Sequence, residues 1–204
     1  MPVISVTLLP GYGADIQERL VARLATAARS VIDASPAGTT VFVNQAQTYQ
    51  RDGRVFRAGG ASRPVASEVV KAFLEALQLR DLDAAQAHLA AGFSMCFPGG
   101  VTLHTLAELT EWARPRYRSI AKTFERFEEV WREQDCVVFC SGTLHGIWND
   151  GQAFSGIRFV DRFEVMDGKI ARQEVWNDMP QTLTSSAQPS AASTAPALAA
   201  TACR

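Results

Sequence analysis

A chain of 204 residues with 47% hydrophobic content is long enough to form one large domain or two small ones. Its 20 basic and 21 acidic residues nearly cancel, which excludes the strongly basic balance typical of nucleic-acid-binding proteins. We find no apolar run long enough to span a bilayer and no signal segment led by Arg or Lys, so we expect no membrane partner and a cytoplasmic location.

The spacing of cysteines indicates neither a metal centre nor a redox pair. Cys96, Cys136, Cys140 and Cys203 form no CxxC pair and no Cys/His cluster. A glycine-rich phosphate loop and a Ser-His-Asp spacing are also missing. We therefore expect no metal and no cofactor, and we interpret the cysteines as small hydrophobic residues in a reducing compartment.

The first 45 residues have the pattern of a β-α-β unit. Residues 3–9 alternate as a half-buried strand that ends at the turn residues PGYG. Apolar residues recur at helical spacing over 14–32, and the β-rich run TTVFVNQ follows at 39–45. Such strands should be parallel and joined by a right-handed crossover. The unit is too small to bury enough surface alone, so we expect a homo-oligomer.

Pro2 stands directly before the first strand and has two interpretations. Proline donates no hydrogen bond to a neighbouring strand, so it suits the first position of a strand. Alternatively, removal of Met1 leaves Pro2 with a free secondary amine. Removing water from such an amine favours its neutral form, which makes it a candidate general base or acid.

The Gly- and Arg-rich residues 50–64 indicate a short hairpin or loop and then a linker, with a domain boundary near residue 60. Helical periodicity follows, with a break near Asp81 that divides it into two helices. Residues 93–97 form a short predicted strand. Thr105 and Glu108 then have the spacing of a capping box, which predicts the start of another helix.

The rest of the chain is dominated by long β-rich stretches. We predict strands over 122–132, 135–148, 153–166 and 169–178. Helices followed by an antiparallel meander are typical of an α+β roll or cone whose concave side the helices cover. We expect domains at 1–60 and 61–182, and a low-complexity, disordered tail at 183–204.

The N-terminal segments MPVISVTLLPGYGADIQERL and TTVFVNQ resemble the tautomerase superfamily of 4-oxalocrotonate tautomerase type. The resemblance covers the first quarter to third of the chain. It implies oligomers of short β-α-β protomers in which the amino-terminal proline transfers a proton between carbon and oxygen. The family's carboxylate-binding arginines are missing from the expected turn and strand, so Tyr12 or Arg51 would orient the substrate. Alternatively, Arg51, Arg54 and Arg57 form only a solvated hairpin.

Residues 64–180 resemble the SnoaL-like branch of the nuclear transport factor 2 superfamily. The segments VVKAFLEALQLRDLDAAQAHLA, FPGG, GTLHGIW, GIRFVDRFEVMDGKI and EVWND carry the resemblance. It implies a cone-shaped α+β fold with a pocket for a small molecule. Because this fold hosts cyclases, dehydratases, isomerases and purely binding proteins, the resemblance alone does not choose an activity.

Asp161 is the leading acid/base candidate of the larger domain. Strand periodicity over 153–165 places it on the more apolar face, among residues such as Phe159 and Phe163. Burial in an apolar site raises the pKa of a carboxyl group, as a general acid or base requires. The alternative is a structural ion pair with Arg158, Arg162 or Arg116.

Several further residues are candidates for substrate binding. Regular pleating of the last strand would place Trp176 and Asp178 near the cavity mouth. Trp112 and Tyr117, with Trp176, would line the apolar wall. His104 follows FPGGVTL in a region that borders the pocket in this fold. Each has a structural alternative: Trp176 as a packing plug, Asp178 as a solvated residue, and His104, like His145, as an ordinary hydrogen-bonded side chain.

These observations leave more than one function open. The first hypothesis is proton transfer on an enolisable carbonyl compound by Pro2, fused to a SnoaL-like pocket in which Asp161 is the acid or base. The second is a ligand-binding protein without catalysis, whose N-terminal unit only drives oligomerisation. In a third, only the SnoaL-like domain is catalytic, as an isomerase, cyclase or dehydratase. All three predict a small-molecule partner.

Overall fold

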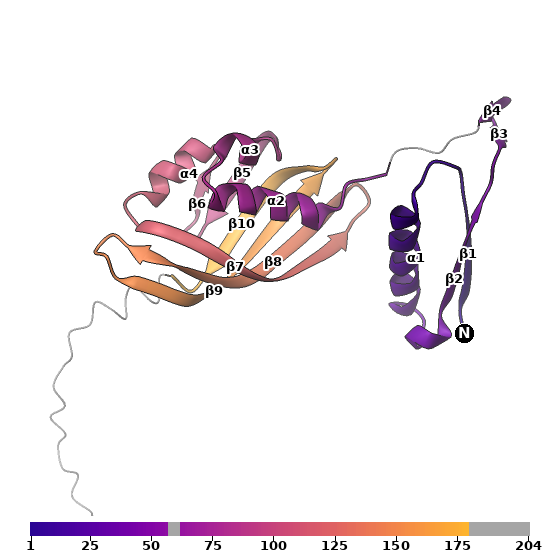
Figure 1. The fold of residues 1–204 in the computed structure, drawn as a ribbon, viewed down its shortest axis with the longest axis horizontal. Helices are drawn as coiled ribbons and strands as arrows, with labels where there is room; N and C mark the ends of the chain where they lie inside the picture. Colours follow the sequence, from indigo (N-terminus) through magenta and orange to yellow (C-terminus); the bar gives the residue numbers. More distant parts are fainter. Residues whose placement is uncertain (57–61, 180–204) are drawn as a thin grey trace, which may run out of the picture. The chain divides into compact units, whose positions relative to one another are not determined.

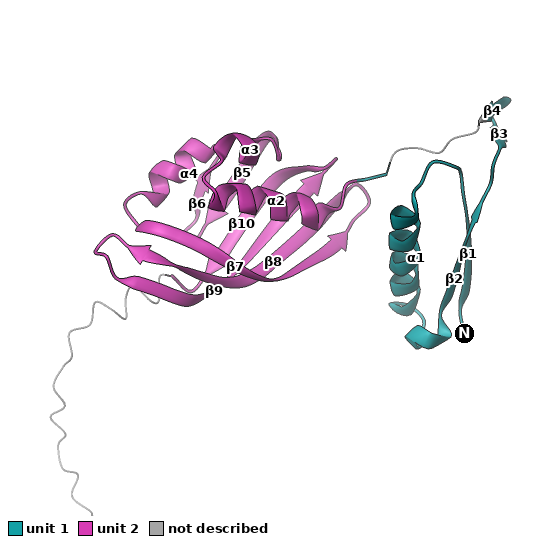
Figure 2. Ribbon diagram, viewed as in Figure 1, with its two compact units in different colours: residues 1–63 teal, residues 64–204 magenta. Residues whose placement is uncertain are grey.

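A computed structural model of the chain describes residues 1–56 and 62–179. The chain divides into two compact units, residues 1–63 and 64–204, shown in two colours in Figure 2. The predicted disordered tail, 183–204, lies outside the described residues, as does Arg57.

Unit 1 is a β-α-β unit followed by a small hairpin. Its elements are β1 (Val3–Leu8), α1 (Ala14–Arg29), the 3-10 turn η1 (Pro36–Gly38), β2 (Thr40–Gln45), β3 (Tyr49–Arg51) and β4 (Arg54–Phe56). The strands β1 and β2 pair in parallel from Val3 opposite Thr40 to Leu8 opposite Gln45, so the predicted parallel pairing is confirmed. The helix ends at Arg29, three residues earlier than its apolar periodicity indicated.

The two-stranded sheet of unit 1 lacks a closed core. No described side chain of this unit is fully buried, and α1 contributes none. Val3 is 65% exposed and Phe42 is 54% exposed, although both belong to the paired strands. An isolated unit of this size buries too little apolar surface to be stable by itself.

Unit 2 is an α+β cone. Figure 1 shows its helices on one face of a curved sheet. The elements are α2 (Ala66–Gln78), α3 (Leu82–Gln86), β5 (Leu89–Phe97), β6 (Val101–Leu103), α4 (Leu106–Ala113), β7 (Tyr117–Trp131), β8 (Asp135–Trp148), β9 (Ala153–Met166) and β10 (Lys169–Asn177). The α+β class that the sequence predicted for this domain is therefore present. The predicted capping box at Thr105 and Glu108 is also present and begins α4.

The six strands are ordered β6-β5-β10-β9-β8-β7. The consecutive pairs from β7 to β10 are antiparallel, as predicted from the meander. The sheet is nevertheless mixed, because β10 also pairs in parallel with β5. The last strand thus lies in the interior of the sheet, between β5 and β9, which are far apart in sequence.

Helix α2 supplies much of the core of unit 2. Its apolar stripe includes Val70, Phe73 and Leu74, all buried against the sheet. The ring of Phe73 meets Phe93 of β5 and Phe163 of β9 edge to face, with centroids 6.3 and 6.2 Å apart. These contacts hold the helix over the concave face of the sheet.

We expect Phe73→Ala to lower the free energy of unfolding by about 3–5 kcal/mol, because it leaves a cavity between three rings that the fold cannot readily fill. Urea unfolding followed by circular dichroism measures the effect. Val160→Ala is the matched control, since Val160 lies on β9 but is 42% exposed; its effect should stay within about 0.5 kcal/mol. Equal losses in both variants would contradict this account of the core.

Candidate functional site

A cavity of about 150 Å³ lies in unit 2 among residues of α2, α4 and the strands β7 to β10. Most of its wall is apolar, with Leu74, Phe97, Ile120 and Val175 among the lining residues. A dry space of this size accommodates a molecule as large as benzene. A mostly apolar wall with a few polar groups is the usual character of a small-molecule site.

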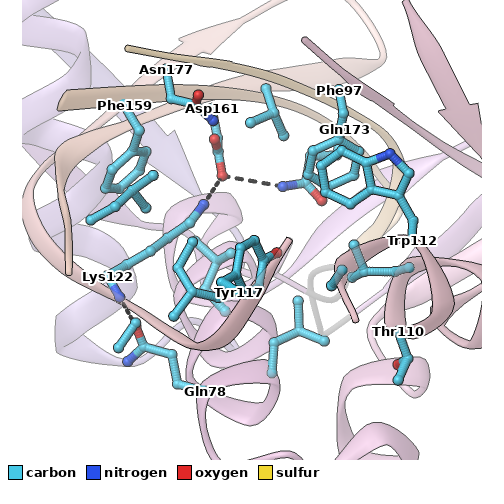
Figure 3. A pocket seen from close by; sticks show the side chains of 18 of the residues that line it. Gln78, Phe97, Thr110, Trp112, Tyr117, Lys122, Phe159, Asp161, Gln173 and Asn177 are labelled. Carbon is cyan, nitrogen blue, oxygen red and sulfur yellow. Dashed lines mark hydrogen bonds and ion pairs between the residues drawn. The ribbon is translucent and has the colours of Figure 1, made fainter. Parts of the chain in front are cut away.

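Asp161 is the fully buried carboxylate of this cavity. It lies on β9, and its side chain has no exposed surface. The alternation of β9 turns Ile157, Phe159, Asp161 and Phe163 inward, as the sequence predicted for this face. Figure 3 shows Lys122 and Gln173 approaching the carboxylate from opposite sides. The Gln173 amide donates to Asp161 Oδ2 over 3.1 Å, and the Lys122 ammonium donates to the same oxygen.

Lys122 is the ion-pair partner of Asp161, so the arginine partners considered from the sequence are wrong. Arg158 instead pairs with Asp178 at 2.7 Å, and Arg162 pairs with Glu164 and Glu174 at 2.7 and 2.8 Å. Even-numbered residues of β9 around Asp161 point to the opposite face of the sheet, so their arginines cannot reach it. Arg116 lies over the ring of Trp112, 3.9 Å from its centroid.

The position of Lys122 depends on a close approach between two strands. A Cβ atom at Gly142 of β8 would lie 2.0 Å from the carbonyl oxygen of Thr123 on β7. Glycine is therefore required at position 142, where β8 pairs closely with β7 beside Thr123, the residue after Lys122. The Lys122 ammonium also lies 4.3 Å from the centroid of the Phe159 ring, a cation–π contact within the same wall.

Burial raises the pKa of the Asp161 carboxyl group above its ordinary value of 3.8, while Lys122 and Gln173 partly oppose the effect. Its second oxygen, Oδ1, is buried and has no hydrogen-bond partner among the described residues. The carboxylate thus combines one oxygen held by two donors with one that has no donor among the described residues. This arrangement is suited to proton transfer to or from a bound ligand.

Trp112 and Tyr117 both line the cavity. Trp112 packs on Phe97 with ring centroids 4.4 Å apart, and its buried Nε1 has no acceptor among the described residues. Burial raises the pKa of Tyr117, against the opposing charges of Arg80 and Arg116, so its hydroxyl stays protonated. Their predicted placement on the wall therefore agrees with the structure, while their binding role stays a prediction.

Trp176 and Asp178 do not line the cavity, because the last strand is not regularly pleated. An irregularity between Ile170 and Arg172 shifts the pairing of β10 with both neighbours. Beyond it, Gln173, Val175 and Asn177 face the cavity, and Trp176 is 52% exposed. A bulge adds one residue to the strand and so exchanges the two faces.

The two histidine candidates lie outside the cavity wall. His104 is exposed, and its backbone N–H donates to Glu108 as part of the cap of α4. His145 is also exposed on β8, with Nδ1 3.5 Å from the Thr123 hydroxyl. The prediction that the region of His104 borders the pocket is therefore wrong for its side chain, since the capping interaction fixes the chain at the helix start.

The N-terminal candidates are far apart within one chain. Pro2 lies at the amino end of β1 and is half-buried, and its carbonyl accepts from Thr40 N–H over 3.1 Å. Tyr12 and Arg51 follow the opposite, carboxyl ends of β1 and β2. A strand of six residues separates the two ends by about 20 Å. Tyr12 and Arg51 therefore cannot orient a substrate at Pro2 of the same chain.

Sequence reasoning missed Lys122, Gln173 and Arg80 as cavity residues. Lys122 offered one signal, since it is a lone lysine within the β-rich run that begins at Tyr117. Gln173 was hidden by the bulge of β10. Arg80 lies at the end of a helix whose periodicity shows only which face is apolar, so nothing in the local pattern points its side chain to the cavity.

No group of three or more His, Cys, Asp and Glu side chains is arranged to hold a metal ion in residues 1–56 and 62–179. Within the same described part of the chain, none of the helices has the length and apolarity needed to cross a membrane.

Two solved structures match the chain over their full length or nearly so. A nuclear transport factor 2-like protein of Burkholderia thailandensis is 17% identical, with a TM-score of 0.51, and the match covers 62% of this chain and 99% of that one. A putative SnoaL-like polyketide cyclase of Jannaschia is 17% identical with a TM-score of 0.50, covering 64% and 100%. At this identity the likeness shows the fold alone. No curated protein matches the chain.

The model of the SnoaL-like domain family matches residues 70–173, which include most of α2, the strands β7 to β9, part of β10 and both members of the Lys122–Asp161 pair. The tautomerase resemblance of unit 1 has no support from these comparisons and stays a prediction. The geometry of unit 2 agrees with the family match, since a curved mixed sheet covered by helices encloses a small-molecule cavity. The chain therefore belongs to the SnoaL-like domain family.

Proposed function

We propose that the cavity of unit 2 catalyses proton transfer on an enolisable carbonyl compound, as an isomerase or cyclase, with Asp161 as the acid/base group. One observation carries this proposal: Asp161 is fully buried in an apolar wall, and its Oδ1 has no protein partner among the described residues. A carboxylate with its pKa raised by burial accepts a proton more readily than one in water.

The residues that line the cavity have different roles in such a reaction. Asp161 removes a proton from the carbon beside the substrate carbonyl; the electron pair of that C–H bond forms the C=C bond of the enolate, and the π pair of the carbonyl moves to its oxygen. Tyr117, a protonated donor in the same wall, stabilises the enolate oxygen through a hydrogen bond. Return of the proton from Asp161 to a different carbon completes an isomerisation. In a cyclisation, the enolate carbon instead attacks a second carbonyl of the same molecule, the π pair of that carbonyl moves to its oxygen, and the resulting alkoxide takes the proton back from Asp161.

Lys122 and Gln173 orient the base. Both bind Oδ2, which leaves Oδ1 as the oxygen without a protein donor and therefore as the proton acceptor of the proposed reaction. The ammonium also stabilises the ionised carboxylate, without which a buried Asp161 would stay protonated and could not act as a base. The apolar wall keeps water from competing for the enolate. The putative polyketide cyclase among the structural neighbours is consistent with this chemistry at the level of the fold only.

We expect Asp161→Asn to slow the isomerisation of 3-cyclohexen-1-one to its conjugated isomer by a factor of about 10² to 10⁴, because the amide cannot accept the proton. Ultraviolet absorbance of the product measures the rate. Asp178→Asn is the matched control, because Asp178 pairs with Arg158 and does not line the cavity. An unchanged rate in Asp161→Asn would favour the alternative, a ligand-binding cavity in which the carboxylate is only structural.

The pH profile provides a separate test. The base is active when ionised, so the rate should rise with pH through a midpoint above 3.8, the direction set by burial of Asp161. Lys122→Met removes the cation that lowers this pKa, so the rising limb should move to higher pH. Lys71→Met is the control, because Lys71 is an exposed helix residue paired with Glu75. A shift of the same size in both variants would contradict direct coupling of Lys122 to the base.

A second candidate activity belongs to Pro2 of unit 1. Pro2 lies half-buried at the start of β1, beside a Met1 that is exposed and accessible to removal. Its carbonyl, and not its nitrogen, takes part in the pairing with β2. The proposal for this unit is proton transfer by the freed amine in a homo-oligomer, where Tyr12 or Arg51 of a neighbouring copy approaches Pro2.

Mass spectrometry should show that Met1 is removed, and light scattering should show an oligomer. In an enol-ketonisation assay with phenylenolpyruvate, Pro2→Ala should lower the rate by about 10² or more, since alanine replaces the secondary amine. Pro10→Ala, in the turn after β1, is the control. Retention of Met1, or an equal rate in Pro2→Ala, would leave unit 1 as an oligomerisation element.

A further inference from the structure

Arg80 has a backbone conformation that favours glycine. It follows the C-cap residue of α2, Leu79, and its φ is +61°. Arg80 N–H donates to Leu77 C=O over 3.1 Å, and Asp81 N–H donates to Ala76 C=O over 3.0 Å. This pair of bonds defines a Schellman motif, in which the residue at the position of Arg80 is usually glycine.

Arginine is an unusual residue for a left-handed backbone conformation, also in comparison with the other described residues that adopt it. The other described non-glycine residues with positive φ, Asp52 and Asp167, are aspartates, whose short polar side chains tolerate this conformation. The left-handed backbone conformation offers no such local advantage to a long side chain. A strained residue of this kind points to a role for its side chain.

The side chain of Arg80 belongs to the cavity wall. It lines the cavity together with Gln78, Leu82 and Tyr117, and as an exposed residue it occupies the solvent-facing rim. Its charge acts on Tyr117. In the described part of the chain its guanidinium makes no ion pair, and the adjacent Asp81 is engaged in capping α3, where its carboxylate accepts from Ala84 N–H over 2.9 Å.

The charges of the wall do not cancel. Its charged lining residues are Arg80, Lys122 and Asp161. Lys122 and Asp161 bind each other, which leaves the charge of Arg80 without a counterpart in the wall. Because a guanidinium presents two parallel N–H donors, its best complement is a carboxylate. The cavity thus combines an internal proton acceptor with a cation at its entrance.

We propose that Arg80 is a specificity-determining residue that selects carbonyl substrates bearing a carboxylate, which it binds at the rim while the enolisable carbon reaches Asp161. This inference rests on the proposed function, since it assigns the substrate class of the same cavity. It makes the substrate a keto acid whose apolar part fills the interior. The strained conformation of Arg80 is then retained because glycine would supply no anion-binding group.

The experiment compares binding of phenylpyruvate and its methyl ester to the full chain by isothermal titration calorimetry. The wild-type protein should bind the acid about tenfold more tightly than the ester, and Arg80→Gln should remove that preference while changing ester binding less than twofold. Arg80→Lys should retain part of the preference. Arg114→Gln is the matched control, because Arg114 pairs with Glu111 on α4 and does not line the cavity.

A second variant separates strain from binding. Arg80→Gly should raise the melting temperature by about 2–4 °C, because glycine relieves the left-handed conformation, and should lose the preference for the acid. The inference is overturned if the wild type binds acid and ester equally or binds neither, or if Arg80→Gln keeps the preference. Asp161→Asn should keep the preference in binding, so failure of the acid/base proposal and failure of this one give different results.

Discussion

The ion pair between Lys122 and Asp161 is the interaction on which the site depends. A carboxylate without exposed surface is costly to bury, and here one ammonium and one amide compensate it through the same oxygen. The pair joins β7 to β9 across β8, and Gln173 joins β10 to them. Every strand from β7 to β10 except β8 thus supplies a polar group. Glycine at position 142 of β8 lets β7 approach closely enough for this arrangement.

Much of the fold of unit 2 follows from local patterns. The long strands, their hairpin turns and the capping box of α4 were all predictable, because periodicity and turn chemistry are properties of neighbouring residues. The inward direction of Asp161 followed from the same alternation. The parallel pairing of β10 with β5 was not predictable, since it joins residues distant in sequence and no local signal records it.

The errors in the site have more than one physical origin. The alternation of side chains along a strand, with its period of two residues, predicts which face each residue lies on only while the pleat is uninterrupted. Because β10 has a bulge, Val175 lines the cavity wall in place of Trp176. A different limit concealed Lys122 as the partner of Asp161, because an ion pair that spans a strand depends on the order of the strands in the sheet. In unit 1 the β-α-β topology was predictable, while the role proposed for Pro2 requires neighbouring copies, about which the pattern of one chain carries no information.

The interior position of β10 also constrains how the protein is made. A strand that must enter between β5 and β9 leaves both of their edges open until residues up to Asn177 have emerged from the ribosome. Until then the nascent domain exposes unpaired backbone and apolar surface, which is the condition that recruits chaperones and favours aggregation. Because Gln173 lies on this strand, the set of polar groups in the cavity is complete only once β10 has paired with its neighbours.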